Sequence, residues 1–343
     1  MILLLFGMLA VIATWCLLAV VFFGFGQLVF RALRLNARGW RYAHLSFWVG
    51  WASSIVLLQL WHLQFPVDAR LSTIVAGLGV AGVVVERKAI IAQCKASWRQ
   101  RNQRQMLRAA VVITAVILFW SALAVGAPHR PDTANYHLAG VRWASAYPVV
   151  PGLGNLHHRL AFNNSSFLYA AMLDVGPWTN KSHHLAHGLL AIVTILYFLS
   201  YVPRVSEVNA PRFPLHLLHA FFLPIAVLFT YKGTTSLQPD FITFLIGLIV
   251  ASLLFELLLS PRSSGQQVRR NTFAICFLSA VGLTVKVSLL PFGFLASCIA
   301  LGYAWRQDGS SAIARRGLLL MSSFCLLYNL TLPTTCRVGC GGG

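Results

Sequence analysis

Long apolar stretches alternate with short polar segments along almost the whole chain. A helix needs about 20 predominantly apolar residues to cross the hydrocarbon core of a bilayer. Ten stretches reach or approach this length, at roughly 2–30, 44–63, 71–91, 109–127, 183–202, 214–231, 240–259, 271–287, 289–305 and 316–333. The pattern therefore predicts an all-α, polytopic integral membrane protein with about ten transmembrane helices.

Two places in this pattern need a closer interpretation. The first stretch lacks a basic start, and arginines follow it as a stop-transfer flank, so it differs from a cleaved signal peptide. Gly24 and Gly26 within it lack the strand–turn–helix context of a dinucleotide site and indicate helix packing instead. Lys286 and Pro291 interrupt 271–287 and 289–305, which are therefore either two short helices or a re-entrant element.

One connection, residues 128–182, is much longer than the others. It is rich in aromatic residues, so we expect it to be structured rather than disordered. Asp132 or Thr133 could cap a helix that starts near Ala134, and Asn164 or Ser165 could cap a second helix around 164–174. We expect interfacial helices here, because Trp and Tyr are favoured at the membrane surface.

The composition excludes a soluble globular domain. Of the 343 residues, 57% are hydrophobic and only 10% are charged, whereas globular domains carry about a quarter charged residues. The seven cysteines are scattered and form no CxxC motif, which argues against a disulfide scaffold.

The charge is strongly unbalanced, with 27 Lys and Arg against 8 Asp and Glu and a net charge of +19. When the bases are sorted by alternating loops, 19 of the 27 fall on one side. The positive-inside rule makes that side cytoplasmic and places the N-terminus and loop 128–182 outside. Nucleic acid is therefore a poor explanation of the charge. The basic run 99–108 could bind anionic lipid headgroups, but the simpler interpretation is a solvated linker.

Few acids are available for chemistry on the outer side. Asp132 follows the fourth stretch, where its carboxylate could act as a general base or could cap a helix or pair with Arg130. Asp240 could cap the seventh stretch, or it could face Asp132 and bind the acceptor or a divalent cation. Lys286 lies in apolar sequence at the outer end of the eighth stretch and could bind phosphate or extend to the surface.

Seven of the eleven histidines fall between 129 and 187. His183 and His187 have i, i+4 spacing, but the glutamate of a zinc-protease motif is missing, and no metal site is predicted. Four further residues of the loop are candidates for contacting a hydroxyl or a lipid phosphate, with interfacial anchoring as the alternative: His137, Arg142, His157 and Arg159.

Several short strings carry a resemblance to a known family. They are Asp132-Thr-Ala-Asn-Tyr136-His137-Leu138, Arg142-Trp143, Val150-Pro-Gly-Leu-Gly-Asn-Leu-His157, Arg159-Leu-Ala-Phe-Asn163, and more weakly Ser236-Leu-Gln-Pro-Asp240 and Thr284-Val-Lys-Val-Ser-Leu-Leu-Pro291. Together they resemble a bacterial family of polytopic membrane proteins over roughly 110–300. That family is similar to the GT-C glycosyltransferases, such as the protein O-mannosyltransferases and aminoarabinose transferases.

The resemblance implies a specific activity in the bacterial inner (cytoplasmic) membrane. GT-C enzymes transfer a sugar from a polyprenyl-phosphate donor to a lipid or glycan acceptor on the extracytoplasmic side. Their first large outer loop begins with an acid that serves as general base, and Asp132 occupies that position. Basic side chains near it would neutralise the leaving phosphate. No cofactor is implied with certainty, and a divalent cation is compatible with the chemistry.

The chain also departs from the GT-C plan. Many relatives carry two adjacent acids where Pro131-Asp132-Thr133 offers one, and the acidic loop follows the fourth stretch instead of the first. We therefore divide the chain into an N-terminal three-helix segment with its basic linker (1–108), a GT-C-like core (109–333) and an atypical Gly-rich tail (334–343). The alternatives are a glycolipid or anionic-solute transporter or flippase, and an inactive, truncated GT-C relative.

Overall fold

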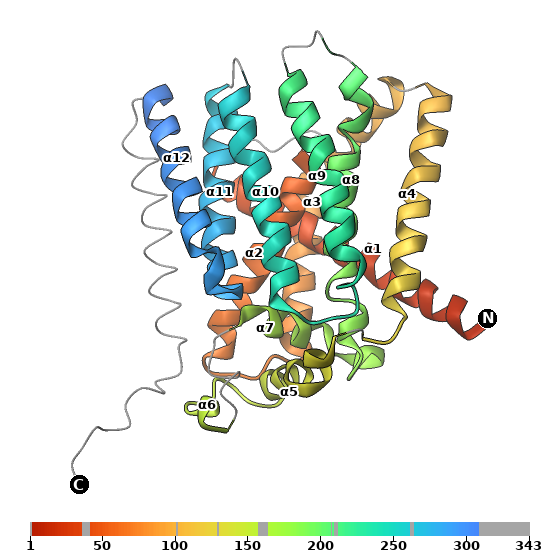
Figure 1. Cartoon of the computed structure of the whole chain (residues 1–343), viewed down its shortest axis with the longest axis vertical. Coiled ribbons are helices and arrows are strands. Elements are labelled where there is room, and N and C mark those ends of the chain that lie inside the picture. Colours follow the sequence, from red (N-terminus) through yellow and green to blue (C-terminus); the bar gives the residue numbers. More distant parts are fainter. Residues whose placement is uncertain are drawn as a thin grey trace.

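The computed structural model describes residues 2–35, 42–100, 102–128, 130–156, 164–206, 208, 212–260 and 264–308. Within these ranges the chain is helical and contains no strand. The long helices lie side by side, and short helices gather at one end of them (Figure 1). We call this the loop end; it contains the described residues between 125 and 187, with 63–68, 232–240 and 286–290 beside them.

Twelve α-helices lie within the described residues. Their bounds are α1 Ile2–Ala32, α2 Ala43–His62, α3 Ala69–Gln100, α4 Gln103–Ala124, α5 Leu138–Ala146, α6 Leu153–Leu156, α7 Ser165–Leu173, α8 Gly188–Leu199, α9 Phe213–Tyr231, α10 Pro239–Leu259, α11 Gly265–Val285 and α12 Leu290–Asp308. Nine of the ten predicted stretches coincide with helices in this list, and the tenth, 316–333, lies outside the described residues.

Seven helical segments within the described residues are long and apolar enough to cross a membrane: Ile2–Ala32, Ala43–His62, Gln103–Ala124, Ser182–Leu199, Phe213–Tyr231, Pro239–Leu259 and Val287–Gln307. The architecture is thus all-helical and consistent with a polytopic membrane protein. The other two long helices, α3 and α11, carry charged residues that lower their mean hydropathy. The interrupted pair forms two antiparallel helices, α11 and α12, which pack against each other (Figure 1).

Several basic residues lie near helix termini at the end of the bundle opposite the loop end. There α3 ends, α4 begins, α8 ends, α9 begins, α10 ends and α11 begins (Figure 1). We call this the basic end, because Arg99, Arg104 and Arg269 lie within a few residues of these helix termini. The predicted sorting of bases between two sides therefore has a counterpart in the arrangement of the helices.

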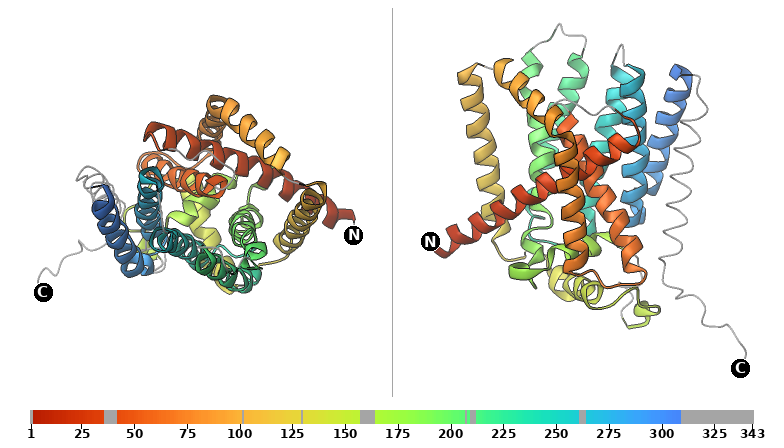
Figure 2. Two further views of the ribbon diagram at one scale, coloured as in Figure 1. Left: turned by 90° about the horizontal axis from the view of Figure 1, so that it is seen from above. Right: turned by 180° about the vertical axis from the view of Figure 1, so that it is seen from behind.

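Glycines let α1 cross α2 and α3 at backbone contact (Figure 2). A Cβ atom placed on Gly50 would lie 1.7 Å from the carbonyl oxygen of Phe22, and one on Gly26 would lie 1.8 Å from that of Ser46. On the α3 side, a Cβ atom on Gly24 would lie 1.9 Å from the carbonyl oxygen of Gly79. The predicted packing role of Gly24 and Gly26 is confirmed.

The second predicted loop helix is present as α7, but it lies inside the bundle. Asn164 caps it as expected, since its Oδ1 accepts from the backbone N–H of Ser166 at 3.1 Å. All nine residues of α7 are buried, because its sequence is apolar on every side and cannot lie half-exposed at an interface. Tyr169 packs against Phe22 and Trp51, and burial raises the pKa of its hydroxyl, so Tyr169 stays neutral.

Candidate functional site

Two connections that are distant in sequence meet at the loop end. The Oγ1 atom of Thr133 and the Oγ atom of Ser236 share a buried hydrogen bond of 3.2 Å. Close by, Thr235 Oγ1 donates to the carbonyl oxygen of Ala127 at 3.1 Å. These bonds fasten the segment that carries Asp132 to the connection that leads into α10 and Asp240.

Asp132 stands directly before a short π-helix, η2, of residues Thr133–His137. It occupies the N-cap position, yet its side chain makes no capping hydrogen bond. The carboxylate is only half-buried. Helix capping, one of the two structural explanations considered for this acid, therefore does not account for it. Short π-helical turns occur frequently at functional sites.

Asp240 and Lys286 form an ion pair across the loop end. Asp240 lies in the first turn of α10, and Lys286 follows the last residue of α11 in an extended conformation. A buried 2.9 Å hydrogen bond between Ser165 and Thr284 holds the start of α7 beside this helix end. Lys286 therefore lies at the end of α11, where the carboxylate of Asp240 already compensates its charge.

This ion pair gives a first test of whether the two residues serve stability. Both side chains are more than a third exposed, and exposed pairs contribute about 0–1 kcal/mol. We expect Asp240→Asn and Lys286→Gln each to lower the free energy of unfolding by less than about 1 kcal/mol. Thermal unfolding of the two variants and of the double variant in detergent measures this. A loss of several kcal/mol would instead assign the pair a structural role.

His137 and His187 are buried in this region. His137 is 1% exposed, and its ring lies 4.3 Å from the Tyr136 ring and 5.4 Å from that of Phe167. His187 stacks on Phe241 at 4.2 Å, and its Nδ1 atom lies 3.1 Å from the carbonyl oxygen of Gly233. These contacts show that both rings belong to the buried packing at the loop end.

His183 and His187 do not share the face of an α-helix, contrary to their spacing. Residues 182–184 form a 3₁₀ turn, and α8 begins only at Gly188, after His187. Among the described residues, no three His, Cys, Asp or Glu side chains are grouped so that they could hold a metal ion.

A groove of about 440 Å³ runs along one side of η2 and α5. Arg142 lines it, and the Nε atom of Arg142 donates to Asn180 at 3.1 Å. The groove wall also includes the ring pair Trp143 and Tyr147, whose centroids are 5.1 Å apart. Its lining begins at Ala134, two residues after Asp132 in the sequence, and does not include Asp132 itself.

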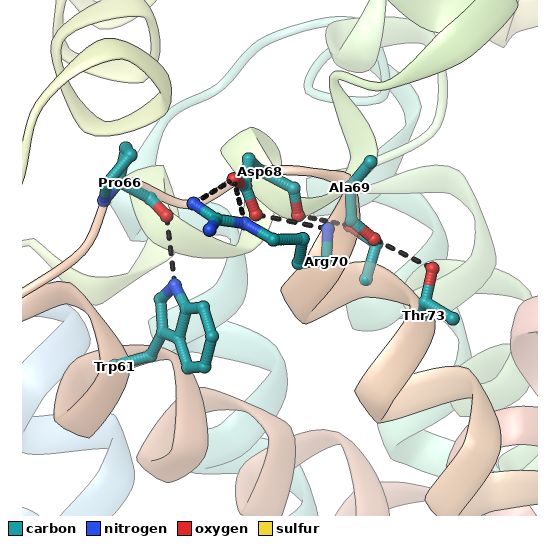
Figure 3. A network of polar contacts seen from close by, with 7 residues as sticks. Trp61, Pro66, Asp68, Ala69, Arg70 and Thr73 are labelled. Carbon is teal, nitrogen blue, oxygen red and sulfur yellow. Dashed lines mark hydrogen bonds and ion pairs between the residues drawn. The ribbon is translucent and has the colours of Figure 1, made fainter.

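The turn between α2 and α3 braces α5 and the residues after it. The backbone N–H of Val67 donates to the carbonyl oxygen of Ala144, and that of Val149 donates to His62, both at 2.9 Å. Within this turn, Asp68 accepts from Arg70 at 2.8 Å (Figure 3). Asp68 is thus an acid of the same region with a local structural role.

The structure brings some of the predicted site residues together. Asp240 contacts Lys286, and the Thr133–Ser236 hydrogen bond links this pair to the Asp132 segment. Arg142 lies farther along, on α5. His157 and Arg159 lie outside the described residues. The contacts of Ser236 and Asn180 could not be predicted, because no local sequence pattern indicates a side-chain hydrogen bond between distant residues.

The sequence matches, over residues 8–331, a family described as "Domain of unknown function (DUF8201)". No curated protein matches the chain, and no solved structure does.

Proposed function

The chain belongs to the DUF8201 family, whose description states no activity. From the resemblance of its sequence strings to GT-C enzymes, together with the placement of Asp132, we propose that it is a membrane glycosyltransferase of the GT-C type. It would transfer a sugar from a polyprenyl-phosphate-linked donor to an extracytoplasmic lipid or glycan acceptor. The observation that carries this proposal is the placement of Asp132. It is a half-buried acid that makes no capping hydrogen bond, at a π-helical turn, two residues in sequence before the first residue that lines the groove of Arg142.

In the proposed reaction, Asp132 is the general base. Its carboxylate accepts the proton of the acceptor hydroxyl as that oxygen bonds to the anomeric carbon of the sugar. The bond between the anomeric carbon and the phosphate oxygen breaks, and the polyprenyl phosphate leaves with the bonding electrons. A cationic side chain such as Arg142 stabilises the negative charge that develops on the phosphate.

The proposed location follows from the charge distribution and the two ends of the bundle. The protein lies in a bacterial inner membrane as a multi-pass protein, with the basic end in the cytoplasm and the loop end and N-terminus outside. Both the lipid-linked donor and the acceptor reach Asp132 at the outer surface. The apolar helices and the grouping of 19 of the 27 bases on one side support this orientation.

Asp132→Asn tests the proposal directly. We expect at least about a hundredfold loss of sugar transfer, because the amide cannot accept the proton. The full-length protein is reconstituted with radiolabelled polyprenyl-phosphate hexoses and pentoses and an extract of bacterial envelope lipids as acceptor. Transfer to a product is then measured together with thermal unfolding, which should stay unchanged.

Asp68→Asn is the matched control, since Asp68 is an acid at the same end whose partner is Arg70. It should retain transfer. Full transfer by Asp132→Asn, or failure of the wild-type protein to bind any such donor, contradicts the proposal. Solute flux in proteoliposomes without a covalent product would favour the transporter alternative.

A further inference from the structure

Helix α3 is longer than the hydrocarbon core of a bilayer is thick. Its 32 residues extend about 48 Å at the usual rise per residue, whereas the hydrocarbon core is about 30 Å thick. The first part packs against α1 through Gly79 and Gly82. The last buried residue is Glu86, which pairs with Arg31 at 2.7 Å. From residue 87 to residue 99, no side chain is buried.

The C-terminal part of α3 carries a surface on which basic and apolar side chains alternate. Successive steps of four and three residues bring five exposed side chains to one side of the helix. We call this surface the α3 face; it consists of Val84, Lys88, Ile91, Lys95 and Trp98. The apolar members are strongly exposed, with Trp98 at 70%. Arg87 and Arg99 flank them.

The bases on and beside the α3 face are not neutralised within the described part of the chain. Neither Lys88, Lys95 nor Arg99 forms an ion pair there. The sequence offers no local acid either, because residues 87–131 contain no Asp or Glu. A cluster of uncompensated positive charge therefore lies next to exposed apolar side chains.

We propose that the α3 face binds the headgroups of anionic phospholipids in the membrane leaflet at the basic end. Val84, Ile91 and Trp98 would enter the boundary of the hydrocarbon, where Trp is favoured. The Lys and Arg side chains would lie along that boundary with their charged groups at the lipid phosphates. The interleaving of apolar and basic residues fits a lipid surface better than it fits nucleic acid or an acidic protein segment, which would contact the bases alone.

Fluorescence quenching measures binding at this face in the full-length protein. Brominated phosphatidylglycerol, titrated into detergent micelles of the protein, quenches nearby indoles, and the difference between wild type and Trp98→Phe isolates the Trp98 signal. We expect phosphatidylglycerol to quench Trp98 at a concentration at least tenfold lower than brominated phosphatidylcholine with the same acyl chains.

Two triple variants distinguish lipid binding at the α3 face from an effect of the overall net charge. Lys88→Gln/Lys95→Gln/Arg99→Gln should raise the half-quenching concentration of phosphatidylglycerol about a hundredfold, at about fivefold per base removed. The control variant, Arg34→Gln/Arg212→Gln/Arg306→Gln, removes the same number of positive charges at other places. These three arginines lie after α1, before α9 and in the last turn of α12. The control variant should change the value by less than fivefold. A Lys88→Arg/Lys95→Arg variant should behave as wild type.

Three results would overturn the proposal. The first is equal quenching of Trp98 by the anionic and the zwitterionic lipid. The second is an equal effect of the two triple variants, which would reduce the result to overall charge. The third is binding of an oligonucleotide or an acidic peptide that depends on the same three bases, without any preference between the lipids.

Discussion

Gly50→Val is expected to separate α1 from α2 and to lower the free energy of unfolding by at least about 3 kcal/mol. The Cβ position at Gly50 lies 1.7 Å from the carbonyl oxygen of Phe22 and 2.7 Å from the backbone nitrogen of Gly26. Both neighbours are helix backbone, so no side-chain rotation can relieve the clash. The two helices must move apart, and the contacts of the buried Trp48 and Trp51 in α2 are then disturbed.

Gly77→Val is the matched control for this substitution. Gly77 lies in α3, and a Cβ atom there meets nothing within 4 Å. Both variants exchange a helical glycine for the same β-branched residue, so their difference measures the contact with α1. Unfolding in increasing dodecyl sulfate, followed by Trp fluorescence, gives the free energies. Equal stability of the two variants would show that the helices do not touch at Gly50.

Glu256→Ala is expected to cost about 3–5 kcal/mol of stability, since it leaves buried polar groups without their charged partner. Glu256 is 4% exposed in α10. Its two carboxylate oxygens accept hydrogen bonds from the side-chain amides of Gln267 and Asn271 in α11, each at 3.2 Å. Asn271 in turn accepts from Arg270, whose guanidinium lies 3.5 Å from the centre of the Tyr42 ring. One carboxylate thus organises the polar contacts between α10 and α11.

Glu256→Gln separates the loss of charge from the loss of the side chain. Its amide keeps one acceptor oxygen and the original volume, so it should lose less stability than Glu256→Ala. Asp68→Ala removes an exposed ion pair and the side chain that caps α3, and it should cost about 1 kcal/mol. The dodecyl sulfate titration described for Gly50 serves for all three. If Glu256→Ala and Asp68→Ala cost the same, the buried network has no stabilising role.

Most of the helical pattern could be predicted, because apolar length is a local property of the sequence. The helices α2, α4, α9 and α10 begin or end within a few residues of the predicted stretches. Capping was predicted correctly at Asn164, at the start of α7, but not at Asp132, whose side chain makes no capping hydrogen bond. The packing of Gly24 and Gly26 was readable as well, since small residues in an apolar helix permit close approach.

Contacts between distant segments could not be predicted. The sequence placed Asp240 and Lys286 separately on the outer side, and only the fold shows that they form an ion pair. Likewise, the burial of α7 depends on α2, α3, α5 and α11, which all contact it. Periodicity indicated a helix there but did not indicate where that helix lies.

The enclosed position of α7 has a consequence for how the protein is made. Because a chain is synthesised from its N-terminus, α2 is available when α7 emerges, but α11 is not. The hydrogen bond between Ser165 and Thr284 joins residues 119 positions apart. Until α11 has entered the bilayer, α7 lacks one wall of its site. Ribosome-bound chains that stop before α11 should therefore expose α7 to protease, and longer chains should protect it.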